Sequence, residues 1–267
     1  MLRKWLAYAL IRFSFRLESL SRLIHSLPVA LLKADNLIEM TKEYYNQPAR
    51  VKAWSNTEER GLYDFEEEFL ERYNLKNSKV LAIGAGGGRE AWALVKLGFD
   101  ATAIDISTGI IVNSFKNNKY KNINNIKFMV KDVYSLDYAS NSFDFVFFSG
   151  GSYSFIPSAG KRIEVLKSIK RVLKKEGVLL LSFMMTGARP IVKYYLLKFI
   201  AILTLGNREI EKGDSIIGEG EFHHGFINEK EIIKEAENSG FIVDKIDIKS
   251  NIGYKFAYLR SKNLPSK

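Results

Sequence analysis

The fold is decided by the run Val80-Leu81-Ala82-Ile83-Gly84-Ala85-Gly86-Gly87-Gly88-Arg89. Its first four residues are apolar, as in a strand that is buried on both faces of a parallel sheet. The glycines that follow are the residues that let a ligand lie almost against the backbone. A helix that begins after such a loop points free N–H groups and the positive end of its dipole at the ligand. The run therefore predicts a binding turn between a buried strand and a helix.

An acidic residue stands at the end of the next apolar segment. Asp105 lies 21 residues after Gly84, within Ala103-Ile104-Asp105-Ile106. At this spacing a carboxylate can bind the two hydroxyls of a ribose whose nucleotide-like body rests on the glycine loop. A dinucleotide-binding loop would have glycine or alanine as its last motif residue, where this chain has Arg89. The loop therefore fits a nicotinamide oxidoreductase poorly.

With Gly84, Gly86 and Gly88 as its glycines, the loop resembles the first motif of the class I S-adenosylmethionine (SAM)-dependent methyltransferases. Further motifs of that family follow in order. The resembling segments are residues 80–89, 102–107, 128–134, 143–149 and 165–183, and residues 228–260 are similar more loosely. The resemblance implies a doubly wound, Rossmann-like α/β fold whose sheet is mostly parallel with an antiparallel last strand. It also implies SAM as cofactor and S-adenosylhomocysteine as product.

For individual residues, the resemblance implies a cofactor site at the carboxyl ends of the strands. The ribose would contact Asp105 and Ile106. The adenine would lie against Val133 with its amino group at Asp132, although an aspartate at a strand end also commonly caps a turn. The residues assigned to the cofactor are Gly84, Ala85, Gly86, Gly88, Asp105, Ile106, Asp132, Val133, Ser149 and Tyr45.

Tyr45 is assigned because Tyr44, Tyr45 and Trp54 resemble the aromatic lid of these enzymes; ordinary packing is the alternative. Two positions depart from the family. Ala82 stands where an acid usually contacts the methionine end of the cofactor, and residues 175–177 replace the usual Pro-Gly-Gly turn. The first departure bears on cofactor affinity, and the second only on turn chemistry.

Catalytic residues are harder to assign, because aligning the methyl donor with its acceptor supplies most of the acceleration. An oxygen acceptor would benefit from a base, and histidine is the best general base available in this sequence. The candidates are His223 and His224, with Tyr153 in the loop where the methyl group should emerge. A packing or surface role is the alternative for both histidines.

Composition limits the other classes. The chain has 267 residues, 46% of them hydrophobic, which suits one core domain with additions. It has no cysteine and three histidines, so we expect no metal and no disulfide. No segment has the length and apolar composition of a membrane span or signal peptide. We expect a cytoplasmic protein.

The net charge of +10 is concentrated near the N-terminus, where residues 1–33 carry six basic residues against Glu18 alone. Apolar residues recur there at helical spacing over Leu2–Ile24, which predicts an amphipathic helix that ends at Pro28. Such a helix could contact the anionic inner face of a membrane, cover an apolar acceptor, form a homodimer interface or be a solvated helix. The basic charge also keeps nucleic acid open as a partner.

The pattern along the chain predicts an N-terminal helical cap over residues 1–74 and a SAM-binding domain over 75–267. Helices are expected near 36–45 and 63–73, and an apolar helix at 191–205 belongs to an inserted cap over about 186–222. The domain alternates strands and helices as expected for a doubly wound sheet. Its expected elements are strands 79–84, 100–105, 126–131, 143–149, 177–184, 241–248 and 254–259, and helices 88–97, 108–118, 160–174 and 228–238.

The sequence therefore predicts a SAM-dependent methyltransferase that acts on a small-molecule or lipid-like acceptor. The acceptor atom, whether oxygen, nitrogen or carbon, stays open. The alternatives are an RNA methyltransferase and a SAM-binding protein without catalysis. The chain lacks the Asn-Pro-Pro-Tyr type of motif found in nucleic-acid enzymes that methylate amino groups.

Overall fold

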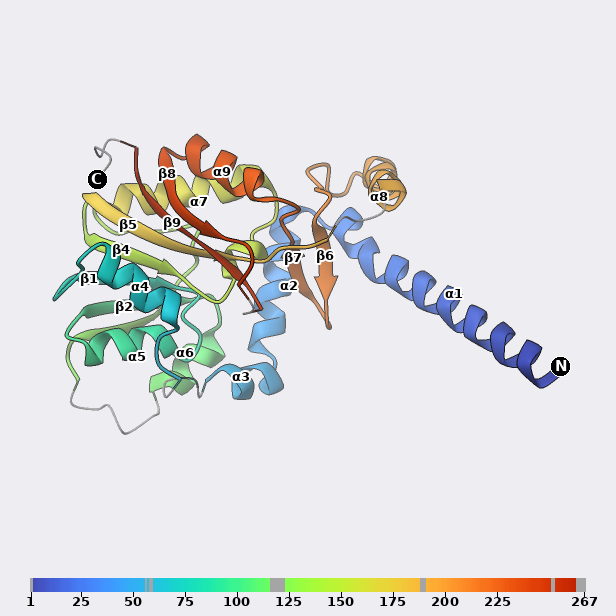
Figure 1. Ribbon diagram of the computed structural model, residues 1–267, viewed down its shortest axis with the longest axis horizontal. Helices are drawn as coiled ribbons and strands as arrows, with labels where there is room; N and C mark the ends of the chain where they lie inside the picture. Colours follow the sequence, from blue (N-terminus) through green and yellow to red (C-terminus); the bar gives the residue numbers. More distant parts are fainter. Residues whose placement is uncertain are drawn as a thin grey trace.

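The computed structural model describes residues 2–55, 57, 60–115, 123–187, 191–250 and 253–262. Within this part of the chain, seven strands form one sheet in the order β3-β2-β1-β4-β5-β9-β8 (Figure 1). The strands are β1 (Lys79–Ile83), β2 (Asp100–Asp105), β3 (Ile126–Val130), β4 (Phe143–Phe148), β5 (Leu173–Phe183), β8 (Phe241–Asp247) and β9 (Lys255–Ser261). Strands β1 to β5 run parallel, and β9 is antiparallel to both β5 and β8. The predicted doubly wound sheet is confirmed.

Helices cover both faces of this sheet, because successive side chains of a buried strand point to opposite faces. Leu81 and Val146 point into a core with α7 (Ala159–Val172) and α9 (Glu229–Asn238). Val80 and Phe145 point into a second core with α4 (Asp64–Arg72) and α5 (Arg89–Lys96). In Figure 1 the two helix layers lie on opposite sides of the strands. The arrangement brings the carboxyl ends of the parallel strands to one edge.

The predicted elements agree with the structure to within a few residues in most places. The expected end of helix 108–118 lies partly outside the described residues, and the described helix α6 is Thr108–Phe115. One strand boundary was wrong. β5 begins at Leu173 rather than near residue 177, because residues 174–177 form an irregularity between two stretches of pairing with β4. There Phe143 pairs with Leu173 and Phe145 with Val178.

The N-terminal helix α1 (Leu2–Leu31) is longer than predicted, since it continues through Pro28. Proline removes one helical hydrogen bond, and the carbonyl that loses its partner belongs to the exposed Ile24. Beyond the proline, Val29 and Ala30 are fully buried. We attribute the continuation of the helix to this packing. The side chains of Leu2, Arg3 and Arg22, which belong to the predicted stripe and basic cluster, lie outside the described residues.

The described part of the chain also contains a 3-10 helix (Ser152–Phe155), three further α-helices and a hairpin. The α-helices and the hairpin strands are α2 (Ala34–Asn46), α3 (Pro48–Trp54), α8 (Ile191–Leu203), β6 (Asp214–Ile217) and β7 (Glu221–His224). The sequence analysis did not predict α3 or the antiparallel hairpin β6–β7. A small third core joins α1, α2, α8 and the hairpin; its members include Val29, Leu37, Leu197 and Phe222. The helices α1, α2 and α8 and the hairpin therefore pack together beside the sheet (Figure 1), whereas α4 packs on a face of the sheet.

In Figure 1, most of α1 extends away from the rest of the molecule, and α8 lies near its attached end. Among the residues that the structure describes, no helix combines the length and the apolar composition that crossing a bilayer requires.

Candidate functional site

A cavity opens at the carboxyl ends of β1, β2 and β4, between the sheet and α2. Its atom-free space, including the open mouth, is about 920 Å³. The residues that line it are Ile38, Thr41, Lys42, Tyr45, Trp54, Ile83, Gly84, Gly86, Ile104, Asp105, Ile106, Ile110, Lys131, Asp132, Val133, Tyr134, Phe148, Ser149, Gly150, Ser152, Phe155 and Ile156. This is the edge of a parallel sheet where ligands are expected.

The glycine loop forms one wall of the cavity and depends on glycine for its shape. Gly84 has φ +67°, and a Cβ there would lie 2.4 Å from the Ser152 Oγ atom. Gly88 has φ +88°, precedes α5 and would carry its Cβ 2.5 Å from the Phe128 ring. Larger residues would therefore fill the turn and collide with its neighbours. The loop backbone is open to a ligand at Gly84 and Gly86, which both line the cavity.

Asp105 ends β2, contacts this loop directly and lines the cavity. One carboxylate oxygen accepts a hydrogen bond from the Gly86 N–H at 2.9 Å, and the other accepts one from the Ser107 N–H at 2.9 Å. Burial raises the pKa of Asp105 above its usual value, and the backbone donors oppose that rise. Each carboxylate oxygen has a second lone-pair site. The group can therefore accept hydrogen bonds from a ligand's hydroxyls while it holds the loop.

The residues predicted for the adenine side follow β3. Asp132 and Val133 both line the cavity, and one oxygen of Asp132 accepts a hydrogen bond from the Tyr134 N–H at 2.9 Å. The turn-capping role of Asp132 is thus present beside the proposed adenine contact. At the end of β4, the Ser149 Oγ atom is buried and has no hydrogen-bond partner among the described residues. A buried hydroxyl without a partner is costly, which indicates that a ligand or water binds at this wall.

The N-terminal cap closes the cavity from above. The Ser107 Oγ atom lies 3.2 Å from the Tyr45 carbonyl oxygen and 3.1 Å from the Asn46 Oδ1 atom. Asn46 Oδ1 also accepts a hydrogen bond from the Gly109 N–H at 3.1 Å. These contacts attach the end of α2 to the start of α6. Tyr45 and Trp54 line the cavity, and their role as a lid over the cofactor stays a prediction. Tyr44 is buried against Tyr45 and is outside the described wall.

A chain of polar side chains leads from the cavity wall into the hairpin. The Tyr45 hydroxyl donates a hydrogen bond of 2.5 Å to Glu221 Oε1, and His223 Nε2 lies 3.2 Å from the same oxygen. The His223 ring packs 4.8 Å from the ring of Phe155, a wall residue. Burial and then the Glu221 charge raise the pKa of Tyr45 well above its usual value. Tyr45 therefore stays protonated and acts as a donor toward a carboxylate.

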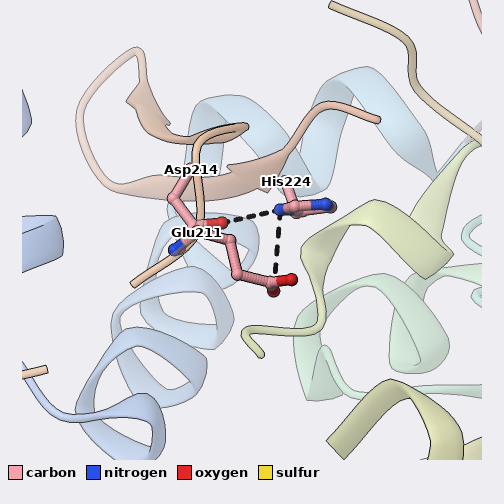
Figure 2. Close-up of side chains that lie close together, drawn as sticks. All are labelled: Glu211, Asp214 and His224. Carbon is pink, nitrogen blue, oxygen red and sulfur yellow. Dashed lines mark hydrogen bonds and ion pairs between the residues drawn. The ribbon is translucent and has the colours of Figure 1, made fainter. Parts of the chain in front are cut away.

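The second histidine lies in a different cluster, with Glu211 and Asp214 (Figure 2). His224 Nδ1 is 2.7 Å from Asp214 Oδ1 and 3.8 Å from Glu211 Oε2. Their potential ligand atoms lie within 4.8 Å of one another, a spacing that could suit a cation. However, Arg162 Nη1 lies 2.9 Å from Glu211 Oε2. A metal bound by that oxygen would face a guanidinium, so we interpret the cluster as an internal ion network.

Tyr153 belongs to the same network. Its hydroxyl donates a hydrogen bond of 2.6 Å to Glu235 Oε2, and Arg162 pairs with the other oxygen of Glu235 at 2.6 Å. Tyr153 is fully buried, and the ring of Phe226 stacks against it at 5.9 Å. The described wall of the cavity includes neither Tyr153 nor His224. Their contacts are those of residues that fix the hairpin and α9 to the sheet.

The position of the missing acid, Ala82, is fully buried in the core. Buried carboxylates do lie near the loop, but on α4 and α5. Glu66 and Glu90 each lie 2.6 Å from an Arg89 guanidinium nitrogen, and the Tyr63 ring lies 4.1 Å from its central carbon. Arg89, which a dinucleotide-binding motif could not accommodate, therefore anchors the helix after the loop to α4.

The structure thus brings eight of the ten predicted cofactor residues into the cavity wall, namely Gly84, Gly86, Asp105, Ile106, Asp132, Val133, Ser149 and Tyr45. Ala85 packs in the core instead, and Gly88 packs against Phe128. Sequence reasoning missed Ile38, Asn46, Lys131 and Phe155. Of these, only Lys131 carried a local signal, since it directly precedes Asp132. The others lie in segments whose approach to the cavity depends on tertiary packing.

Comparison with known proteins agrees with the predicted methyltransferase fold. Residues 80–177 match a family model described as a methyltransferase domain. The chain is 30% identical over 118 residues to the Bacillus subtilis protein named "Putative methyltransferase YqeM", an alignment that covers 44% of this chain and 47% of that protein. The chain thus spans about half the length of that curated relative.

Solved structures share the fold over a larger part of the chain. A SAM-dependent methyltransferase from Methanosarcina mazei is 23% identical with a TM-score of 0.56, covering 75% of this chain and 96% of that one. The 1,6-didemethyltoxoflavin-N1-methyltransferase of Burkholderia thailandensis, solved with 1,6-didemethyltoxoflavin and S-adenosylhomocysteine, is 13% identical with a TM-score of 0.60. It covers 87% of this chain and 92% of that one. Residues 80–177 of the sheet domain therefore match a methyltransferase domain, and the sheet order and the glycine loop agree with the resemblance to the class I SAM-dependent methyltransferases.

Proposed function

We propose that this protein binds SAM in the cavity and transfers its methyl group to a small-molecule or lipid-like acceptor. The observation that carries the proposal is the pairing of Asp105 with the glycine loop at the end of β1. The residues present fit the cofactor. The loop would receive its amino-acid portion, Asp105 the ribose and Val133 the adenine. Ser149 offers a buried hydroxyl where no partner is described.

When bound, SAM supplies an electrophilic methyl carbon whose bond to sulfur breaks, leaving the electron pair on sulfur. The chain's part is to align the acceptor and, for an oxygen or nitrogen acceptor, to take its proton. Tyr45 is the wall residue suited to that task. The acceptor's proton passes to the Tyr45 oxygen as the Tyr45 hydrogen passes to Glu221, 2.5 Å away. His223 Nε2 lies 3.2 Å from the same carboxylate oxygen.

The part of the cavity wall that is not assigned to the cofactor supports an apolar acceptor. Ile38, Phe155 and Ile156 line the cavity between α2 and the loop after β4. The N-terminal basic residues, which kept RNA open as a substrate, lie on a helix that also exposes apolar side chains. That combination favours a lipid-like partner over RNA.

The test has two parts. Calorimetry with SAM, S-adenosylhomocysteine and NAD should show binding of the first two and not the third. Labelled SAM is then incubated with panels of small molecules, phospholipid vesicles and RNA. Tight binding without methyl transfer to any panel would support a SAM-binding protein without catalysis, and labelled RNA would overturn the acceptor class.

The proton path is tested by Tyr45→Phe, with Tyr44→Phe as the matched control because Tyr44 is outside the described wall. The Tyr45 variant should lose about 100-fold or more in kcat, the scale of general acid–base catalysis. Its affinity for S-adenosylhomocysteine should change little. An unchanged kcat would remove Tyr45 from the proton path.

A further inference from the structure

The predicted apolar stripe of α1 does not pack against the rest of the protein. Its described members Leu6, Leu10, Phe13, Leu17, Leu20 and Ile24 each retain between 50% and 60% of their accessible surface. Helical periodicity places them on one face. An amphipathic stripe usually marks the buried face of a helix, so exposure along this length needs a partner to cover it.

A second exposed apolar surface lies on α8, beside the attached end of α1. One face of α8 is buried through Leu197 and Ala201 in the third core. The opposite face consists of Ile191, Val192, Tyr195, Leu196, Phe199, Ile202 and Leu203, whose exposure ranges from 40% to 76%. Each of the two helices therefore exposes an apolar face, and α8 lies beside the attached end of α1 (Figure 1).

The ends of the two helices are held together closely. The Asn207 N–H donates a hydrogen bond of 2.9 Å to the Ala30 carbonyl oxygen. A Cβ at Gly206 would lie 2.1 Å from that same oxygen, so the approach depends on glycine. The apolar surface is thus built on a fixed junction.

Charge indicates what covers this surface. Lys4, Arg12 and Arg16 are exposed on α1, and Lys193 and Lys198 flank the apolar face of α8. The two helices contain one acidic residue, Glu18. A second copy of the chain would bring the same positive charges together, whereas an anionic lipid surface is complementary to both helices.

We propose that α1 and α8 form a docking surface for an anionic lipid bilayer. The helices lie in the interface, with their apolar residues among the acyl chains and their basic residues at the head groups. α2 follows α1 after two residues, Leu32 and Lys33, and contributes Ile38, Thr41 and Tyr45 to the cavity wall. The docking surface is therefore attached directly to the roof of the cavity. Resting on the proposed function, this placement favours an acceptor that resides in the bilayer.

The full-length protein is tested by flotation with phosphatidylcholine vesicles, with and without phosphatidylglycerol, at low and high salt. We expect it to float with the anionic vesicles only and to be released by salt. Arg12→Glu with Arg16→Glu should weaken this binding about tenfold or more, given the contribution of each basic residue near such a surface. Phe199→Glu with Ile202→Glu should weaken it through loss of apolar contact.

The matched controls are Lys96→Glu and Leu97→Glu, which change a basic and an exposed apolar residue at the end of α5. Both should float as the unchanged protein does. Binding of S-adenosylhomocysteine confirms that each variant is folded. If the unchanged protein does not bind S-adenosylhomocysteine, the proposed function is refuted, whereas the proposed docking surface is still tested by flotation. The proposal is overturned if the unchanged protein floats with no vesicle. It is also overturned if the protein does not bind vesicles but light scattering shows a dimer that the α8 variant dissociates.

Discussion

The Gly86 N–H donates a hydrogen bond to Asp105 Oδ2 at 2.9 Å, so the acid of the second strand also fixes the glycine loop of the first. The same carboxylate accepts the Ser107 N–H, which begins the approach to α6. One side chain thus connects the loop, the end of β2 and the next helix. Removing its charge should disturb both the ligand contacts and the shape of the loop.

We therefore predict that Asp105→Asn weakens binding of S-adenosylhomocysteine. The asparagine amide has one acceptor oxygen, and its NH2 group would face the N–H of either Gly86 or Ser107, so one of the two hydrogen bonds would be lost. The expected loss is about 10-fold to 100-fold, the range for a charged hydrogen-bond partner. Calorimetry measures it, with Asp100→Asn at the other end of β2 as control. Equal affinity in both variants would remove Asp105 from the ribose site.

Gly84→Ala should abolish detectable cofactor binding and lower stability. The new Cβ would meet Ser152 Oγ at 2.4 Å, and the backbone has φ +67°, which is unfavourable for alanine. Gly187→Ala is the control, because nothing lies within 4 Å of the added atom. Binding and thermal unfolding are measured for both. Full binding by the Gly84 variant would show that the loop accommodates a side chain and is not the close-contact wall.

Stability should decrease as pH rises from about 4.5 to about 7 through Glu66. Burial raises the pKa of Glu66 from 4.5 to about 7, with Glu90 adding to the rise and Arg89 opposing it. The folded state thus binds this proton more tightly than the unfolded chain. The contribution is complete below pH 4.5 and is lost as pH passes 7, a change of up to about 3 kcal/mol.

Glu66→Gln should flatten this dependence, because the amide does not titrate. Unfolding midpoints across that pH range test the prediction, with the exposed Glu67→Gln as control. If the curve of the Glu66 variant parallels that of the unchanged protein, another group is responsible.

Metal should have no influence on the cluster of Glu211, Asp214 and His224. Arg162 lies 2.9 Å from the Glu211 oxygen that a cation would need. We predict that chelator alters neither the unfolding midpoint nor the affinity for S-adenosylhomocysteine, and that zinc does not stabilise the protein. Stabilisation by zinc that His224→Gln removes, and that the control His25→Gln retains, would establish a metal site.

The sheet and most of the cofactor wall could be predicted because their signals are local. A buried parallel strand, its glycine turn and the acid ending the next strand are each read from fewer than about ten residues. The spacing from Gly84 to Asp105 then predicts that the carboxylate lies beside the glycine loop. The acceptor side of the cavity has no comparable local sequence motif. Tyr45, Glu221 and Phe155 come from three distant segments, and their contact depends on the packing of α2 against the hairpin.

The errors have physical causes of the same kind. A proline inside a helix usually ends or kinks it. At Pro28 the helix continues, because Val29 and Ala30 make buried contacts that stabilise it beyond the proline. The hairpin β6–β7 lay in a stretch rich in glycine and charge, which obscured its alternation. His223 and His224 are adjacent in sequence, yet strand geometry points them to opposite faces. Only one of them therefore approaches the cavity.

The change from exposed to buried residues within α1 implies that two parts of one helix are under different constraints on their side chains. Up to Ile24 its residues face outward, and any side chain of similar polarity and charge should serve there. From Ser26 onward, Ser26, Val29 and Ala30 are buried, and Val29 and Ala30 pack in the third core, where side-chain shape is decisive. The natural boundary for trimming, fusing or grafting this helix therefore falls near Ile24, within the helix, and not at the loop that follows it.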